Sequence, residues 1–272
     1  MPIYQGTSTK NKSEIIINGT PMSKVYVGDR LVWQKPSGVY PVEYGLLYNW
    51  PAATDARKIT SSDDWVVSRH TPTFDVNSDT NILRNYIGVT GAGGKLKETG
   101  LTYWITPNTG ATNEVAFNGR GSGSRRYSDG VFINIKTQFL FWSNAAYNAT
   151  TGIVAGTLQS NVDTFTVSST GVSTLNKYSG ISIRLLYIGV GTPTSYTGND
   201  GKVYRVVTIG TQTWLADNLA ETRFRNGDFI PWYGANPANY FTNAEWVALT
   251  TAGCCAYNNN VNNVASGFTF PI

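Results

Sequence analysis

The 272-residue sequence predicts an α+β fold that is rich in β-strands. Glycine (28 residues) and tyrosine (16) are abundant, and only 14% of residues are charged, which is typical of loop-rich β-proteins with uncharged polar surfaces. Short apolar runs alternate with turn dipeptides such as Asn18-Gly19. Apolar residues recur at helical spacing in only a few short segments. At this length the chain can bury a core of ordinary size.

The first segment, residues 1–35, is expected to be a small β-meander, because turn dipeptides separate three short apolar runs. These runs are Ile15–Ile17, Val25–Val27 and Leu31–Trp33. So few strands bury too little area to be stable alone, so we expect this segment to anchor the chain on a partner or to oligomerise. The residues expected to make that docking contact are Ile15, Ile17, Val25, Val27, Leu31 and Trp33.

Residues 36–190 form the predicted major domain. A helix is expected over residues 77–87, where Ser78 or Asp79 can cap the N-terminus. Phe139–Trp142 and Ile181–Leu186 are expected to be buried or alternating strands. The Thr-, Ser- and Val-rich stretch 152–178 is typical of exposed strands.

Residues 191–201 are rich in Gly, Pro, Thr and Ser and are interpreted as a linker. A new unit, residues 202–272, begins with an alternating strand over Lys202–Ile209. Near its end, Thr242 and Glu245 have the spacing of a capping box and predict a short helix that reaches Leu249.

Charge and hydropathy exclude several classes of function. The formal net charge is +4 and the basic residues are scattered, so nucleic-acid binding is not expected. No apolar run approaches the roughly 20 residues of a membrane helix, and the N-terminus does not resemble an export signal. We therefore expect no membrane or nucleic-acid partner. Cys254 and Cys255 are adjacent, which favours free thiols over a mutual disulfide.

Catalytic and metal-binding patterns are incomplete. His70 is the only histidine and is expected to be a surface or turn residue. Glu98, Glu114 and Asp129 are candidate glycosidase carboxyls, but no spacing rule connects them. No catalytic residue, metal or cofactor is expected, and the chain is predicted not to be an enzyme.

Two further motifs fail in detail. The segment from Asp75 to Asp79 has alternating oxygen ligands like a calcium loop, but Thr80 replaces the required glycine, so it is interpreted as a helix-capping cluster. Gly91–Lys95 lacks the spacing of a phosphate loop and is expected to be a turn.

A long, ordered motif set identifies a family resemblance. Its elements in the major domain are Tyr44-Gly-Leu-Leu-Tyr-Asn-Trp50, Gly93-Gly-Lys-Leu-Lys-Glu98, Trp104, Pro107-Asn-Thr-Gly-Ala-Thr-Asn113, Phe117, Arg125, Gly130-Val-Phe132, Trp142-Ser143 and Ser182-Ile-Arg184. In this order they resemble the Fibrobacter succinogenes major paralogous domain over roughly half the chain. The resemblance implies a C-type-lectin-like fold.

The C-terminal unit carries further motifs of that family, including Ile209-Gly-Thr-Gln-Thr-Trp-Leu-Ala-Asp-Asn-Leu219. In the family these motifs precede the Tyr-Gly-x-Leu-Tyr-Asn-Trp segment, whereas here they follow it. Either residues 198–272 begin a second, truncated copy, or they complete the first domain by circular permutation or by exchange between protomers. Completion is favoured, because a lone half-domain would expose Trp214, Trp232 and Trp246.

The N-terminal segment resembles short leader modules of tail and fibre proteins from tailed bacteriophages, in particular those that infect gut Bacteroidetes. This resemblance implies a structural virion protein, in a head or tail fibre or a decoration, that assembles in the host cytoplasm. Other capsid or tail proteins would be its partners, a homotrimer its assembly and a host-surface glycan or protein its ligand. A bacterial carbohydrate-binding module and a glycoside-active enzyme are the alternative functions.

The candidate ligand-binding residues lie where variable lectin-like folds often display their binding face. They are Arg125, Arg126, Tyr127, Asn144, Tyr147 and Asn148, which are expected to be exposed. Thr106-Pro107-Asn108 only partly matches the calcium-binding loop of sugar-binding C-type lectins, so calcium-dependent binding is not expected. Trp104 and Trp142 are expected to belong to the core.

Overall fold

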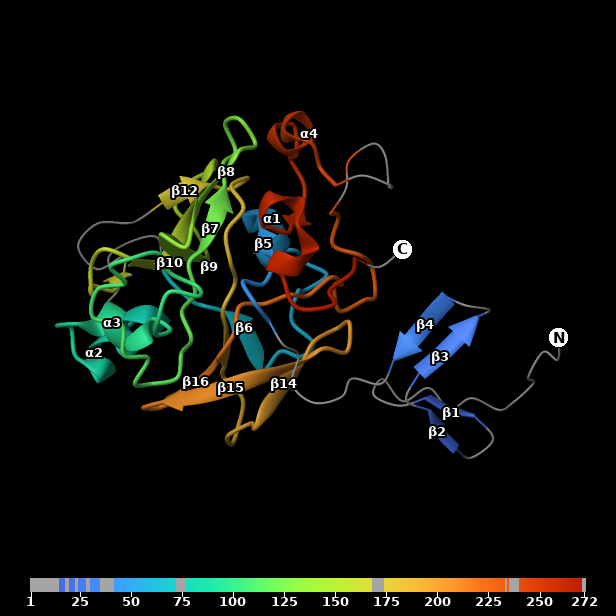
Figure 1. Ribbon diagram of the computed structural model, residues 1–272, viewed down its shortest axis with the longest axis horizontal. Helices are drawn as coiled ribbons and strands as arrows, with labels where there is room; N and C mark the ends of the chain where they lie inside the picture. Colours follow the sequence, from blue (N-terminus) through green and yellow to red (C-terminus); the bar gives the residue numbers. More distant parts are fainter. Residues whose placement is uncertain are drawn as a thin grey trace.

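The computed structural model describes residues 42–71, 77–167, 174–232, 234 and 240–270, together with the backbone of four short strands before residue 35. This part of the chain confirms the predicted β-rich α+β class (Figure 1). None of its helices is long and apolar enough to cross a membrane.

The four N-terminal strands form two antiparallel pairs. Strand β1 (Ile15–Ile17) pairs with β2 (Thr20–Met22), and β3 (Lys24–Val27) pairs with β4 (Arg30–Gln34). The three predicted runs lie in strands, but the prediction of a single meander is wrong, because the four strands form two separate two-stranded sheets. The sequence Thr20–Met22 is an additional strand that was not predicted, because it mixes polar and apolar residues. The side chains of the predicted docking residues lie outside the described part of the structure.

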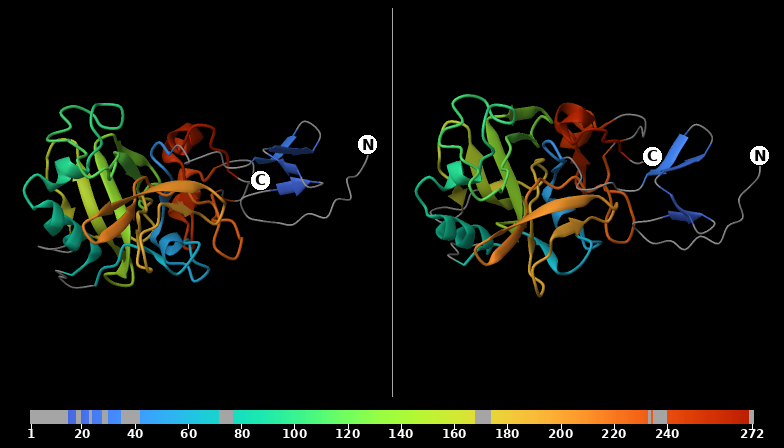
Figure 2. Two further views of the ribbon diagram at one scale, coloured as in Figure 1. Left: turned by 90° about the horizontal axis from the view of Figure 1, so that it is seen from below. Right: turned by 60° about the horizontal axis from the view of Figure 1, so that its bottom comes forward.

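A five-stranded antiparallel sheet joins the two predicted units. Its strand order is β14 (Ser195–Thr197), β15 (Val203–Ile209), β16 (Gln212–Leu215), β13 (Leu185–Tyr187) and β6 (Trp65–Val67). Leu186 lies opposite Trp214 where β13 pairs with β16. Strands from both sides of residue 200 therefore share one sheet (Figures 1 and 2), as expected if the C-terminal unit completes the domain.

The predicted linker, residues 191–201, contains strand β14, which pairs with the start of β15. Tyr196 lies in this strand and is buried at 1% exposure, and Gly201 turns the chain with φ of 84°. The interpretation of the whole segment as a linker is therefore wrong. Its Gly and Pro content masked a β-hairpin that a buried tyrosine anchors to the core.

A second sheet consists of β9 (Gln138–Ala146), β10 (Thr151–Gln159), β11 (Thr166–Val167) and β12 (Thr174–Asn176). Strand β10 pairs with β9 on one side and with β11 and β12 on the other. The expectation of exposed strands is wrong for β10, which is buried from residue 152 to residue 158. Gly156 allows this burial, because a Cβ there would lie 2.5 Å from the Phe165 ring.

Two small strand pairs extend the fold. Strand β7 (Ser122–Arg125) pairs with β8 (Phe132–Ile135), and β5 (Leu47–Tyr48) pairs with β17 (Cys254–Cys255). The β5–β17 pair is a second place where the C-terminal unit pairs with the major domain. Both cysteines are buried free thiols, as predicted.

Capping signals located two of the helices. Ser78 caps α2 (Asp79–Ile87), and Thr242 with Glu245 forms the predicted capping box of α4 (Asn243–Val247). The other helical segments are α1 (Trp50–Ala53), α3 (Ala92–Leu96), η1 (Tyr257–Asn259) and η2 (Val261–Asn263).

Helix α3 replaces the turn expected over Gly91–Lys95. A Cβ on Gly94 would lie 2.0 Å from the Gly110 carbonyl oxygen, and one on Gly93 would lie 2.2 Å from that of Thr164. The glycines therefore allow close backbone packing against α3.

The core consists mainly of two aromatic-rich clusters. One contains Trp142 and the other Trp104, and both tryptophans are fully buried, as predicted. Both clusters also draw on residues after 200, such as Leu215 in the first and Trp214 in the second. The C-terminal unit therefore supplies part of the core that buries the predicted tryptophans.

Candidate functional site

A groove of about 480 Å³ lies on the second sheet. Its floor is the face of β9, β10 and β11 that carries Gln138 and Gln159 at one end, where Gln159 is exposed, and the buried Leu140 and Thr157 (6% and 8% exposed) at the other. Thr157 of β10 lies between Leu140 of β9 and Thr166 of β11, and Gln138 lies opposite Gln159. Because residues two apart in a strand face the same side, these five side chains form one continuous surface, and all of them line the groove.

The groove has two walls. The β7–β8 hairpin contributes Ser124, Tyr127 and Ile133, and β12 contributes Leu175 and Asn176 opposite them. The floor and walls combine hydroxyl and amide side chains with a few aliphatic ones and one tyrosine. The volume of this groove lies within the range of small-molecule pockets, and its lining is more polar than is usual for them.

Three of the six predicted ligand residues, Arg125, Arg126 and Tyr127, line this groove. Tyr127 is 46% exposed at its rim. Arg126 is also exposed and forms an ion pair with Asp129. This hydrogen-bonded pairing raises the pKa of Arg126 and lowers that of Asp129.

The expectation that Arg125 is exposed is wrong, because its side chain is fully buried. Its guanidinium donates hydrogen bonds to the carbonyl oxygens of Gly130 (2.9 Å), Phe241 (2.9 Å) and Thr242 (3.1 Å). It also lies 4.6 Å from the centre of the Trp246 ring. Burial lowers the pKa of Arg125. Arg125 therefore links the groove wall to the C-terminal unit through hydrogen bonds. Only its neighbours Arg126 and Tyr127, of these three residues, are exposed for contact with a ligand.

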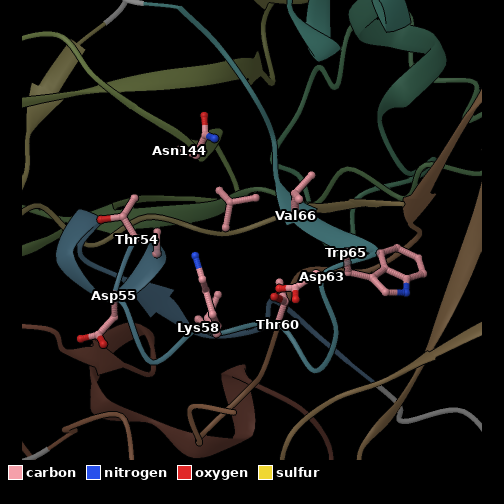
Figure 3. A pocket seen from close by; sticks show the side chains of 11 residues that line it. Thr54, Asp55, Lys58, Thr60, Asp63, Trp65, Val66 and Asn144 are labelled. Atoms are coloured by element: carbon pink, nitrogen blue, oxygen red, sulfur yellow. The ribbon is translucent and has the colours of Figure 1, made fainter. Parts of the chain in front are cut away.

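Asn144 does not belong to the groove. It is exposed and lines a separate cavity of 290 Å³ between α1, the loop that follows it and β6. Figure 3 shows Asn144 across this cavity from Lys58, with Thr54 beside the amine. The Asn144 side-chain oxygen accepts a hydrogen bond from the backbone of His70 at 3.4 Å, so the residue helps to hold the segment that follows β6.

Tyr147 and Asn148 lie at the tip of the β9–β10 hairpin and are exposed. The Asn148 side-chain oxygen accepts hydrogen bonds from the backbone of Thr150 (2.9 Å) and Thr151 (2.8 Å). Asn148 therefore shapes the turn. Neither residue is among those that line the groove.

The candidate catalytic carboxyls are distributed over three separate ion pairs. Glu98 pairs with Arg120, Glu114 with Lys95, and Asp129 with Arg126. No two of them share a basic partner. A glycosidase needs two opposed carboxyls across one cleft, and these ion pairs give no sign of such an arrangement.

His70 differs from expectation, because it is buried at 7% exposure. Within residues 42–270 that the structure describes, no group of three or more His, Cys, Asp or Glu side chains could hold a metal ion. Of the predicted capping cluster, Ser78 caps α2 and Asp79 pairs with Arg69, whereas Asp75 lies outside the described residues.

The sequence interpretation missed the groove floor. Gln138 and Leu140 alternate with Phe139 and Phe141, which pack in a different core cluster from Leu140, and this period of two indicated that the two faces of β9 have different surroundings. The partner strand gave no such signal, because β10 itself contains glycines and small residues, such as Gly152 and Gly156. Only the register of the sheet shows that Thr157 lies beside Leu140.

Comparisons with protein-family models, with curated proteins and with solved structures found no match to this chain.

Proposed function

We propose that this chain is a non-catalytic recognition protein whose groove binds a glycan or protein on a host surface. The groove on β9, β10 and β11 is the observation that carries the proposal. Its walls come from hairpin β7–β8 and strand β12, and they surround a floor of uncharged polar side chains. Tyrosine, amide and hydroxyl groups suit recognition through stacking and hydrogen bonds.

The rigidity of the groove supports this function. Strand β10 is hydrogen-bonded on both sides, so the floor is held by regular sheet pairing. The β7–β8 wall is fixed by Arg125, which donates hydrogen bonds to Phe241 and Thr242. A site on such a scaffold keeps its side chains in place before binding, and this lowers the ordering cost of association.

The proposal includes a C-type-lectin-like fold of the Fibrobacter succinogenes major paralogous type. The family motifs supply Trp104, Trp142 and Trp214, and each is fully buried in a core to which both units contribute. Arg184 of the motif Ser-Ile-Arg is also buried and donates hydrogen bonds to the carbonyl oxygens of Phe117 (2.7 Å) and Leu215 (2.8 Å). These motif residues are thus buried and stabilise the core, as expected of residues that define a fold.

The proposed setting is the virion of a tailed bacteriophage, where residues 1–35 attach the protein to the capsid or tail. The support is the leader-like sequence and the two strand pairs within it. A homotrimer would present several grooves, and avidity would let weak sites hold a cell. Deletion of residues 1–35 is expected to abolish incorporation into particles, measured by mass spectrometry of purified virions. Normal incorporation of the shortened chain would contradict the anchoring role.

A pair of tyrosine variants tests the groove. Tyr127 lines the groove and Tyr147 lies at a hairpin tip outside it, yet their exposures are similar at 46% and 50%. Tyr127→Ala is expected to reduce binding of the labelled protein to Bacteroidetes cells by at least about tenfold, because a stacking anchor is worth over 1 kcal/mol. Tyr147→Ala, the matched control, is expected to bind as the unaltered chain does. Equal binding by all three proteins would overturn the assignment to the groove.

A further inference from the structure

We propose that the ligand of the groove is a neutral oligosaccharide, held without calcium. This inference rests on the proposed recognition function and narrows its ligand to one chemical class. It depends on three properties of the groove. These are the charge of its lining residues, the lack of carboxylate oxygens in its described lining, and the pairing of the backbone in its floor strands.

The charge of the groove favours an uncharged ligand. Among the described residues that line it, only Arg125 and Arg126 are charged. The Arg125 guanidinium is buried and bonded to backbone carbonyls, and Arg126 is paired with Asp129. An acidic sugar or acidic peptide would therefore have to break an existing ion pair to gain one, so the net electrostatic gain is small.

The oxygen ligands of the groove do not suit calcium. Protein sites for Ca²⁺ supply about six to eight oxygens, several of them from carboxylates. The described lining contains no aspartate or glutamate. The nearest carboxylate along the chain, that of Asp129, accepts hydrogen bonds from Arg126 and from the backbone of Val131. A sugar in this groove would therefore be bound by side chains directly.

The backbone of the floor does not suit an added peptide strand. Peptides that extend a sheet need a free strand edge. Strand β10 has β9 on one side and β11 and β12 on the other. Strand β10 therefore offers side chains in place of backbone groups. Of the strands beside it in the floor, β11 is only two residues long, and the outer edge of β9 exchanges hydrogen bonds with Ser182 at Leu140 and Trp142. A ligand rich in hydroxyl groups can bond to the side chains without needing a strand edge.

The side-chain pattern matches the two kinds of surface on a neutral sugar. A pyranose ring has an apolar C–H face and a rim of hydroxyl groups, which act as both donors and acceptors. The exposed ring of Tyr127 suits the C–H face, and the half-buried Leu175 adds a second apolar contact. Amides and hydroxyls such as Gln159 and Thr157 can both donate and accept, as sugar hydroxyls require.

The test uses the full chain on an array of defined neutral oligosaccharides, acidic oligosaccharides and proteins, followed by calorimetry on the strongest binder. A neutral oligosaccharide is expected to bind best. Its affinity is expected to change by less than about twofold when EDTA is added or when NaCl is raised from about 0.05 to about 0.5 M, because no ion pair is screened. Tyr127→Ala and Gln159→Ala are expected to weaken it by at least about tenfold, and Tyr147→Ala is expected to leave it unchanged.

Other outcomes overturn the inference in distinguishable ways. Preference for acidic sugars with strong salt dependence, loss of binding in EDTA, or binding to proteins alone would each refute the neutral, calcium-free ligand. If Tyr127→Ala still weakened cell binding in those cases, the proposed recognition function would stand and only its ligand class would fail. If the groove variants bound cells as the unaltered chain does, both proposals would fail together.

Discussion

The backbone N–H of Glu43 donates a hydrogen bond to the carbonyl oxygen of Val264 at 2.8 Å. Residues 221 positions apart in the chain are therefore neighbours, and Tyr44 repeats the contact with Asn263 at 2.9 Å. The beginning and the end of the domain thus lie side by side. This is the geometry that a circular permutation requires, because an ancestral connection at this point would be short.

Removal of the C-terminal unit tests this relationship. A chain that ends at residue 190 loses β15 and β16 and, with them, Trp214 and Leu215 of the core. Trp104 and Trp142 are then expected to become solvent-exposed, with red-shifted fluorescence, and cooperative urea unfolding is expected to disappear. The full-length chain provides the control. Blue-shifted emission and a sharp transition in the shortened chain would show that residues 198–272 are a separate unit.

The buried Arg184 is expected to be irreplaceable by lysine. Its guanidinium donates hydrogen bonds to Asn218, Phe117, Leu215 and Asn118 over distances of 2.7–2.9 Å. A lysine ammonium cannot reproduce this planar fork, so buried acceptors lose their donors. Arg184→Lys is expected to lower the free energy of unfolding by about 2–4 kcal/mol.

Urea unfolding of two variants measures this effect. The matched control is Arg223→Lys, a partly exposed arginine bonded to Gly227, for which a change within about 0.5 kcal/mol is expected. Equal effects at both positions would show that the hydrogen-bond fork of Arg184 contributes little.

Local signals made part of the fold predictable from the sequence. The capping groups of Ser78 and Thr242 act within a few residues of themselves, so the starts of α2 and α4 follow from short motifs. The strand at Val203–Ile209 alternates along its own length. The burial of Trp104 and Trp142 follows from their large apolar surface.

Properties that depend on distant partners were not predictable. Arg125 looked exposed because its neighbours are polar, but its hydrogen-bond acceptors include Phe241 and Thr242, more than one hundred residues away. The groove floor was not predictable for the same reason, because Thr157 lies beside Leu140 only in the observed register of β9 and β10. Half of the predicted ligand residues line the groove, namely the consecutive Arg125, Arg126 and Tyr127, whereas Asn144 lies on β9 beside a separate cavity and Tyr147 and Asn148 lie at the β9–β10 hairpin tip.

The close packing around α3 predicts that a single methyl group added at Gly94 strongly lowers the stability of the protein. A Cβ at Gly94 would lie 2.0 Å from the carbonyl oxygen of Gly110, which is backbone and cannot rotate away. Gly94→Ala is expected to destabilise the protein by at least about 3 kcal/mol, as an overpacked core site does. The control is Gly191→Ala, where a Cβ meets nothing within 4 Å but φ is 88°, so a loss of about 1–2 kcal/mol is expected. Thermal unfolding followed by circular dichroism compares the two, and similar melting temperatures would contradict the packing argument.

The buried carboxyl of Glu221 predicts a dependence of stability on pH. Burial, reinforced by the neighbouring Asp200 carboxylate, raises the pKa of Glu221 well above its ordinary value of 4.5. The folded state therefore holds a proton that the unfolded state releases. Stability from this group is complete below pH 4.5 and is lost as pH rises towards the folded-state pKa, by up to about 1.4 kcal/mol per pH unit.

Comparison with Glu221→Gln isolates this contribution. The amide resembles the protonated carboxyl and can still accept the backbone N–H groups of Thr222 and Arg223, but it does not titrate. The pKa of Asp200 is lowered below its ordinary value of 3.8, so its own contribution changes only in more acidic solution. Between about pH 5 and 8 the unaltered chain is therefore expected to lose stability relative to the variant in urea titrations. Glu114→Gln, which changes an exposed carboxyl, is expected to retain the pH slope of the unaltered chain, and an unchanged slope in Glu221→Gln would show that Glu221 is not the titrating group.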